Sequence, residues 1–186
     1  MSRRLVVGLT GSSAPQLGLT LLHALRDISS VETHLVVSQG ARLSLKLEAG
    51  VDVSQVEELA DRAYRPEDLA ASISSGSFLT MGMVVMPCSM RTLGAIASGI
   101  SSDLIARAAD VTLKERRRLV LVPRETPLNL VHIRNMETVT LAGGVILPPM
   151  PAFYHRPKTI EDLLLQTVGK VLDQFEIEHA LYRRWE

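Results

Sequence analysis

The chain has 186 residues, a length that fits one domain burying about 70% of the surface its unfolded form exposes. Its 20 Lys and Arg balance its 20 Asp and Glu, so no net charge favours binding to nucleic acid or an anionic membrane. A single cysteine excludes an internal disulfide, and the apolar runs are too short for a signal peptide or membrane helix, so we expect a cytoplasmic protein.

Short, continuous apolar runs predict strands at Leu5–Leu9, Thr33–Val37, Met83–Met86, Leu119–Val122 and Val145–Leu147. Helical spacing of apolar residues predicts helices at Leu17–Leu25, Ala41–Leu47, Leu93–Ala97, Leu104–Leu113, Leu130–Leu141 and Ile160–Phe175. This alternation predicts an α/β fold with an open parallel sheet and helices on both faces. We expect a single domain over residues 1–186. The Ser- and Gly-rich segment 70–78 is expected to be a mobile loop or an inert connection.

Polar residues follow the carboxyl ends of four of the five predicted strands. Ligands of open α/β sheets bind beyond these ends. The residues concerned are Thr10, Gly11, Ser12, Ser13, Ser38, Pro87, Cys88, Ser89, Arg91, Thr92, Arg124 and Glu125. Their convergence predicts a ligand site at this edge of the sheet.

The turn TGSSAP after the first strand carries two hydroxyls and only one glycine. Free N–H groups and hydroxyls at the start of a helix favour an anion, although Ser12 or Ser13 could equally cap the following helix. The glycines that let a dinucleotide's pyrophosphate lie along the backbone are missing. A single phosphate, as in a mononucleotide, fits this turn better.

The stretch PCSMRTL has the same arrangement of strand, hydroxyl and helix start. Ser89 and Thr92 are expected to cap the helix, to bind phosphate, or both. Cys88 has no base placed near it, which favours a small buried thiol over a nucleophile.

Arg124 and Glu125 follow the carboxyl end of the fourth predicted strand. A carboxylate beside cationic groups at a ligand edge is a candidate for proton transfer, and the alternative is an ion pair that holds the loop. Metal ligation is not expected, because none of the histidines has ligand spacing: His23, His34, His132, His155 and His179. The proline-rich stretch PPMPAFYHRPKT is expected to form a subunit contact or a lid.

Six motifs in order, TGSSAPQLG, ETHLVVSQGA, AASISSGSF, PCSMRTL, RAADVTLKERRRLVLVPRETPL and PPMPAFYHRP, resemble the UbiX-like flavin prenyltransferases. The resemblance covers nearly the whole chain. It implies a flavodoxin-like, Rossmann-like three-layer subunit that assembles as a homo-oligomer, usually a dodecamer. It also implies transfer of a dimethylallyl group from dimethylallyl phosphate to N5 and C6 of reduced FMN, without a metal. The prenylated FMN then serves a UbiD-type decarboxylase.

The resemblance assigns roles to particular residues. FMN would be held by Gly11, Ser12, Ser13, Ser38, Ser89, Met90, Arg91, Thr92 and Arg124. The prenyl phosphate would be bound by Arg107, Lys114, Tyr154 and Lys170, and catalysis would use Ser13, Glu48, Lys114 and Glu125. Gln39, Ala14-Pro15 and Lys170 depart from the residues common in the family, and a Lys grips phosphate as a point charge where Arg would be bidentate.

Two further expectations concern the assembly and the rivals. Tyr154 and Lys170 lie on segments that a compact subunit would not bring to the ligand edge, so we expect them to reach the prenyl phosphate across a subunit interface. The C-terminal helix and tail, 159–186, would contribute to such contacts. The alternatives are an FMN-binding accessory subunit without its own chemistry and a peptidyl-cysteine decarboxylase. The second is disfavoured because PRETPLNLVHIRNM lacks that group's P-x-M-N-x-x-M pattern.

Overall fold

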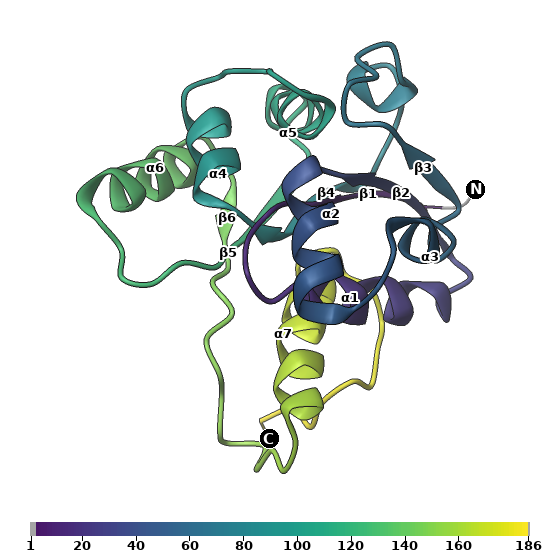
Figure 1. Ribbon diagram of the computed structural model, residues 1–186, viewed down its shortest axis with the longest axis vertical. Coiled ribbons are helices and arrows are strands. Elements are labelled where there is room, and N and C mark those ends of the chain that lie inside the picture. The colour runs from purple at the N-terminus through teal and green to yellow at the C-terminus, as the bar shows by residue number, and fades with distance from the viewer. Residues whose placement is uncertain (1–2, 186) are drawn as a thin grey trace.

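A computed structural model describes residues 3–185, and its centre is a six-stranded sheet whose paired strands are all parallel (Figure 1). The strands are β1 (Arg3–Leu9), β2 (Val31–Val37), β3 (Arg62–Tyr64), β4 (Gly82–Cys88), β5 (Arg118–Pro123) and β6 (Val145–Ile146). Their order is β3-β2-β1-β4-β5-β6, the doubly wound order of Rossmann-like sheets. Without the short edge strand β3, the order is that of flavodoxin.

Helices cover both faces of this sheet, which confirms the predicted three-layer α/β fold (Figure 1). The elements are α1 (Gln16–Arg26), α2 (Gln39–Ser44), the π-helical turn η1 (Leu45–Ala49), α3 (Val53–Glu57), the 3₁₀ turn η2 (Ser72–Ser74), α4 (Met90–Ala97), α5 (Leu104–Lys114), α6 (Leu130–Leu141) and α7 (Ile160–Gln174). Helices α1 and α7 pack on one face, and α4, α5 and α6 pack on the other. No helix within 3–185 is long and apolar enough to cross a bilayer.

Strand β1 shows why the continuous apolar runs form central strands. Leu5, Val7 and Leu9 point into the core under α1 and α7, while Val6 points into the core under α4 and α5. Successive side chains of a strand alternate between faces, so a strand covered on both sides must be apolar throughout. A Cβ on Gly8 would lie 3.2 Å from Cγ2 of Ile105, so the absence of a side chain lets α5 pack closely on the sheet.

The sequence predicted five strands, and the structure has a sixth, β3. This strand has three residues at the edge of the sheet, and Arg62 and Ala63 are exposed, so it lacks the apolar run by which the others were recognised. The helix predicted over 41–47 is divided between α2 and the π-helical η1. The segment that follows β3 lies next to the site described below.

Candidate functional site

The turn between β1 and α1 is held by side chains from distant segments. Ser12 Oγ donates a hydrogen bond to the carbonyl oxygen of Arg124 at 2.6 Å, and Ser13 Oγ donates to Glu48 Oε2 at 2.8 Å. Neither serine caps α1, whose N-cap is Pro15 without a side-chain hydrogen bond, so that alternative is wrong. The Glu48 carboxylate also accepts from the backbone N–H of Ala14 at 3.0 Å. Ala14 has a φ of 69°, in the left-handed region, so the Glu48 carboxylate stabilises a strained turn.

Gly11 is required by a close approach of two loops. A Cβ at Gly11 would lie 2.7 Å from Cα of Gly40, in the first turn of α2. Carbon atoms in contact are normally about 3.5–4.0 Å apart, so any side chain here would push the two loops apart. The one glycine of the TGSS turn is therefore needed to join it to the segment after β2.

A cavity of about 480 Å³ lies at the carboxyl edge of the sheet. Five of the predicted cofactor residues line it: Gly11, Ser38, Ser89, Arg91 and Thr92. Ser38 caps α2 by accepting from the N–H of Ala41 at 3.1 Å, and Ser89 caps α4 by accepting from the N–H of Thr92 at 3.3 Å. Both serines therefore cap a helix and line the cavity. The start of α4 brings hydroxyls, the backbone N–H groups of the first helical turn and the positive end of a helix dipole to one place, which suits a phosphate.

Apart from Gln39, which the family resemblance placed near the flavin, the rest of the cavity lining was not predicted. It consists of Gly40, Pro66, Glu67, Leu69, Ser102 and Asp103. Pro66 and Glu67 follow the unpredicted strand β3, so their segment was not recognised as a strand end. The carbonyl of Pro66 accepts from the N–H of Leu104 at 2.8 Å, which joins this segment to the start of α5. Recognising Arg62–Tyr64 as an edge strand would have located them.

A second, apolar pocket of about 310 Å³ contains Glu125. Its lining is Met90, Pro123, Arg124, Glu125, Thr126, Leu128, Met136, Pro148, Pro149 and Met150. Ser12 lines neither pocket but connects them, because it contacts Arg124 while its neighbour Gly11 lines the first. The Glu125 side chain is exposed and accepts from the N–H of Thr126 at 3.0 Å. It makes no ion pair with Arg124 among the contacts of the described chain, so the loop-holding alternative lacks support.

Cys88 is a buried thiol, as predicted. Its side chain is fully buried, and burial raises its pKa to about 12, with a smaller opposing effect from a backbone hydrogen bond. The thiolate, not the thiol, is the nucleophile. Cys88 therefore packs the end of β4 and does not carry the chemistry.

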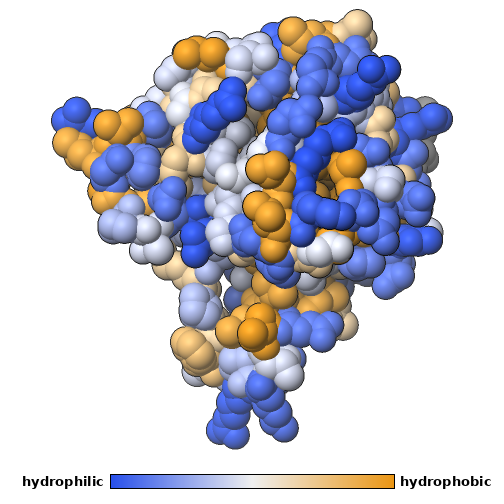
Figure 2. Space-filling view, viewed as in Figure 1, coloured by the Kyte–Doolittle hydropathy of each residue, from blue (hydrophilic) through white to orange (hydrophobic). Residues whose placement is uncertain are grey.

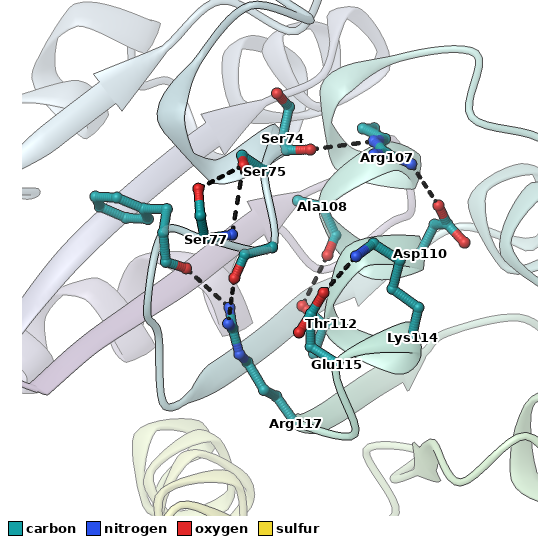
Figure 3. A network of polar contacts seen from close by, with 12 residues as sticks. Ser74, Ser75, Ser77, Arg107, Ala108, Asp110, Thr112, Lys114, Glu115 and Arg117 are labelled. Atoms are coloured by element: carbon teal, nitrogen blue, oxygen red, sulfur yellow. Dashed lines mark hydrogen bonds and ion pairs between the residues drawn. The ribbon is translucent and has the colours of Figure 1, made fainter.

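The structure does not bring Lys114 to this edge of the sheet. Helix α5 begins beside the cavity at Asp103 and ends at Lys114, near the start of β5. At 1.5 Å per residue these two ends are about 16 Å apart. Lys114 pairs with Glu115, while Arg107 donates to Asp110 at 2.7 Å and to the carbonyl of Ser74 at 3.2 Å (Figure 3).

The Ser- and Gly-rich segment 70–78 lies against the side of α5 that carries Arg107 and Lys114. Arg117 donates to the carbonyls of Gly76 at 2.6 Å and Phe78 at 2.8 Å, and Arg107 holds Ser74 (Figure 3). These contacts argue against the mobile loop that the composition suggested. They make the segment part of one surface with Arg107 and Lys114.

Tyr154 and Lys170 are each linked to the C-terminal segment, Tyr154 through Trp185 and Lys170 through Asp173, which binds Arg184. The chain after β6 runs away from the body of the sheet to the end where the C-terminal segment also finishes (Figure 1). There the ring of Tyr154 lies 5.7 Å from that of Trp185 in an edge-on arrangement. Lys170, on α7, lies 3.7 Å from Asp173 Oδ2. Neither residue lines the two pockets described above.

The comparisons with known proteins point to one family. The family model described as Flavoprotein matches residues 1–173. The flavin prenyltransferase UbiX of Escherichia coli (strain K12) is 52% identical over 186 residues, which cover 99% of this chain and 98% of that protein. The chain is a member of the flavin prenyltransferase family.

Two solved structures of such proteins show how far the likeness extends. A crystal structure of AnUbiX (PadA1) in complex with FMN and dimethylallyl pyrophosphate matches with a TM-score of 0.98 and 53% identity, covering 100% of this chain and 98% of that one. A dodecameric FMN-dependent Ubix-like decarboxylase from Escherichia coli O157:H7 matches with a TM-score of 0.96 and 50% identity, covering 98% and 99%. The flavodoxin-like fold predicted for this chain is thus confirmed. In the described part of the chain, no group of three or more His, Cys, Asp or Glu could hold a metal ion.

Proposed function

We propose that this protein transfers a dimethylallyl group from dimethylallyl phosphate to N5 and C6 of reduced FMN. The observation that carries the proposal is the pair of adjoining pockets, one with a single-phosphate cradle at α4 and one apolar with a carboxylate. Relatives at about half identity are named flavin prenyltransferases, and AnUbiX was crystallised with FMN and dimethylallyl pyrophosphate. Reduced FMN supplies the electron-rich ring atoms that accept the prenyl group.

The first pocket fits FMN by the chemistry of its donors. The hydroxyls of Ser38, Ser89 and Thr92 and the start of α4 would hold the phosphate, with Arg91 adding a positive charge. One phosphate needs no glycine-rich path along the backbone, which explains the sparse glycines of the TGSS turn. Ser12 lies between the pockets and contacts Arg124 in the lining of the second, and both would hold the flavin ring there. Ser13, fixed by Glu48, would face the ring's reacting edge.

The second pocket suits an allylic group that loses its phosphate. Breaking the carbon–oxygen bond leaves positive charge on the prenyl group and an additional negative charge on the phosphate. Apolar walls such as Met90 and Met136 exclude water that would otherwise capture the prenyl cation. Glu125 would protonate the departing phosphate, or act in the formation of the second bond, in which the prenyl double bond takes up one proton and C6 releases one. The cradle at α4 is reserved for FMN, so other cations must take the prenyl phosphate.

We propose that the groups that bind the prenyl phosphate, two lysines and the hydroxyl of Tyr154, come from other subunits. Lys114, Tyr154 and Lys170 line neither pocket of their own chain, and with Arg107 they are the residues that the family resemblance assigns to the prenyl phosphate. Side chains beyond reach within one subunit can still complete the site of a neighbour. The relative from Escherichia coli O157:H7 is a dodecamer. Exposed apolar side chains over α6, and over α2 with η1, would form subunit contacts (Figure 2).

Two roles without prenyl transfer are weaker. An accessory subunit that only stores FMN would not need an apolar pocket with Glu125 beside the cradle. A peptidyl-cysteine decarboxylase would carry the P-x-M-N-x-x-M pattern, which the segment from Pro123 to Met136 lacks. We further propose that the product serves a UbiD-type decarboxylase in the cytoplasm, in keeping with the single buried cysteine.

The proposal is tested by phosphate release. The protein is incubated anaerobically with dimethylallyl phosphate, with or without reduced FMN, and inorganic phosphate is measured. We expect release only with reduced FMN and in proportion to it, because the flavin is the acceptor. Release without any flavin would indicate a phosphatase, and no release with reduced FMN would favour the accessory subunit.

A further inference from the structure

The C-terminal segment is folded back onto α7 by one carboxylate, that of Asp173. Its Oδ1 accepts from His179 Nε2 at 3.0 Å and from Arg184 Nη2 at 2.7 Å. Its Oδ2 accepts from Tyr182 Oη at 2.8 Å and from Arg184 Nη1 at 3.2 Å. The other ring nitrogen of His179, Nδ1, accepts from the N–H of Leu181. Nε2 is therefore the protonated nitrogen and donates the hydrogen bond to Asp173. Four bonds to three residues of one segment make this carboxylate a clamp.

Packing around the clamp is as specific as its hydrogen bonds. A Cβ on Gly169, one turn before Asp173 on α7, would lie 2.5 Å from the ring of Tyr182 and 2.8 Å from that of His179. The side chains of His179 and Asp173 are only 3% and 18% exposed. The segment therefore lies directly against the helix backbone, in a place that a larger residue would close.

The protonation states of Asp173 and Tyr182 favour their hydrogen bond over a wide pH range. Burial by itself would raise the pKa of Asp173, but hydrogen bonds from Arg184, Tyr182 and His179 outweigh it and hold the pKa well below its ordinary value. Burial and the neighbouring carboxylate raise the pKa of Tyr182 to about 12, so its hydroxyl remains a donor. Neither partner titrates between mildly acidic and mildly alkaline pH.

The clamp connects Tyr154 and Lys170, two residues that the proposed function places against the prenyl phosphate of a neighbouring subunit. Arg184 places the next residue, Trp185, edge-on against the ring of Tyr154. Lys170 lies beside the same carboxylate, 3.7 Å from Oδ2. A pocket of about 260 Å³ opens between the segment that carries Tyr154 and the C-terminal residues. Tyr154 is otherwise on a proline-rich arm with no hydrogen bond from its hydroxyl in the described structure.

We propose that Asp173 is a positioning residue for prenyl transfer. It holds the C-terminal segment so that Trp185 fixes the ring of Tyr154, and it keeps Lys170 beside its own carboxylate. The inference rests on the proposed function. Asp173 does not touch substrate in this account; it acts through Lys170 and through the chain from Arg184 to Trp185. Its loss should weaken the capture and use of the prenyl phosphate and leave FMN binding as it is.

The test compares full-length Asp173→Asn, Trp185→Ala and the double variant with wild type. Asparagine keeps the shape of aspartate but offers an N–H where Arg184 and Tyr182 need an acceptor. Misplacing a substrate-binding group by about 1 Å can cost about a hundredfold in rate, so we expect kcat/KM for dimethylallyl phosphate to fall about ten- to a hundredfold. The FMN dissociation constant should stay within about twofold, which a general loss of folding would not allow. Glu57→Gln, which removes the carboxylate paired with Arg42 on another surface, is the control and should behave as wild type.

Non-additivity separates positioning from independent damage. If Asp173 acts in part through Trp185, the double variant should be less impaired than the product of the two single losses. Trp185 is 79% exposed, so its substitution is not expected to affect folding. Fully multiplicative losses, or an unaltered kcat/KM in Asp173→Asn, would overturn the proposal.

A spectroscopic readout is independent of activity. Trp185 is the only tryptophan of the chain, so its fluorescence anisotropy reports on the C-terminal segment alone. We expect anisotropy to fall in Asp173→Asn, because a released segment moves faster, and to be unchanged in Glu57→Gln. If wild type transferred no prenyl group while the anisotropy still fell, the proposed function would fail but the clamp would stand. Unchanged anisotropy in Asp173→Asn would refute the clamp itself.

Discussion

Substituting Gly11 by alanine tests whether the contact between the TGSS turn and α2 forms the FMN cradle. The new Cβ would lie 2.7 Å from Cα of Gly40, which is backbone and cannot rotate away. Relief requires a separation of about 1 Å between two segments that both line the 480 Å³ cavity. Overpacking of this kind typically costs about 1–3 kcal/mol. If binding FMN requires the original spacing, that cost appears as a dissociation constant about five- to 150-fold higher.

The assay is titration of FMN followed by quenching of flavin fluorescence, with thermal unfolding measured on the same samples. Gly94→Ala is the matched control, because its Cβ would meet only the side-chain Nδ2 of Asn135 at 3.4 Å, and alanine favours helix α4. It should bind FMN as wild type does. Wild-type affinity in a folded Gly11→Ala protein would refute the reasoning, since the two segments could then separate without harm to the site.

Four other predictions follow from the site and its surroundings. Glu125→Gln should bind FMN normally but lose about a hundred- to ten-thousandfold in turnover, because the amide cannot transfer a proton; near-normal turnover would make Glu125 structural. Mixed oligomers of inactive Lys170→Ala and inactive Glu125→Gln subunits should regain prenyl transfer if sites combine groups from different chains, and demonstrably mixed but inactive oligomers would exclude a shared site. Cys88 should resist iodoacetamide in the native protein at pH 8 and react only after unfolding, since its pKa is raised to about 12; rapid native labelling would contradict its burial. Asp173→Asn should lower the free energy of unfolding by about 1.5–3 kcal/mol at pH 7. Because the pKa of Asp173 is depressed in the folded state, the difference in the free energy of unfolding between the two proteins should be constant above the unfolded pKa of about 3.9 and shrink as pH falls below it. A difference that persisted unchanged at pH 2 would refute the role of the ionised Asp173 carboxylate in stability.

The central strands could be predicted from the sequence because their environment dictates their composition. Val6 and Val7 face opposite layers of the molecule and both must be apolar, which leaves a continuous run that is easy to recognise. Strand β3 left no such run, since it is short and lies at an exposed edge. The contribution of Pro66 and Glu67 to the cavity was missed for the same reason.

Contacts between residues that are far apart in the sequence could not be predicted from local sequence patterns. The bond between Ser13 and Glu48 joins residues from two turns, and no spacing rule links them before the sheet order is known. Lys114 is different, because a helix between parallel strands must run back to the amino edge of the sheet. Its position at the end of α5, far from the cavity, could therefore have been derived from the predicted topology. The assignment of individual residues to FMN and to the prenyl phosphate stays a prediction.

The measurement that tests the central claim most directly is the mass of the flavin after one turnover. The protein is mixed anaerobically with reduced FMN and dimethylallyl phosphate, the reaction is stopped, and the released flavin is analysed by mass spectrometry. The account predicts a flavin heavier than FMN by one isoprene unit, formed in wild type and sharply reduced in Glu125→Gln. Recovery of unmodified FMN alone, from protein shown to have bound both ligands, would contradict it.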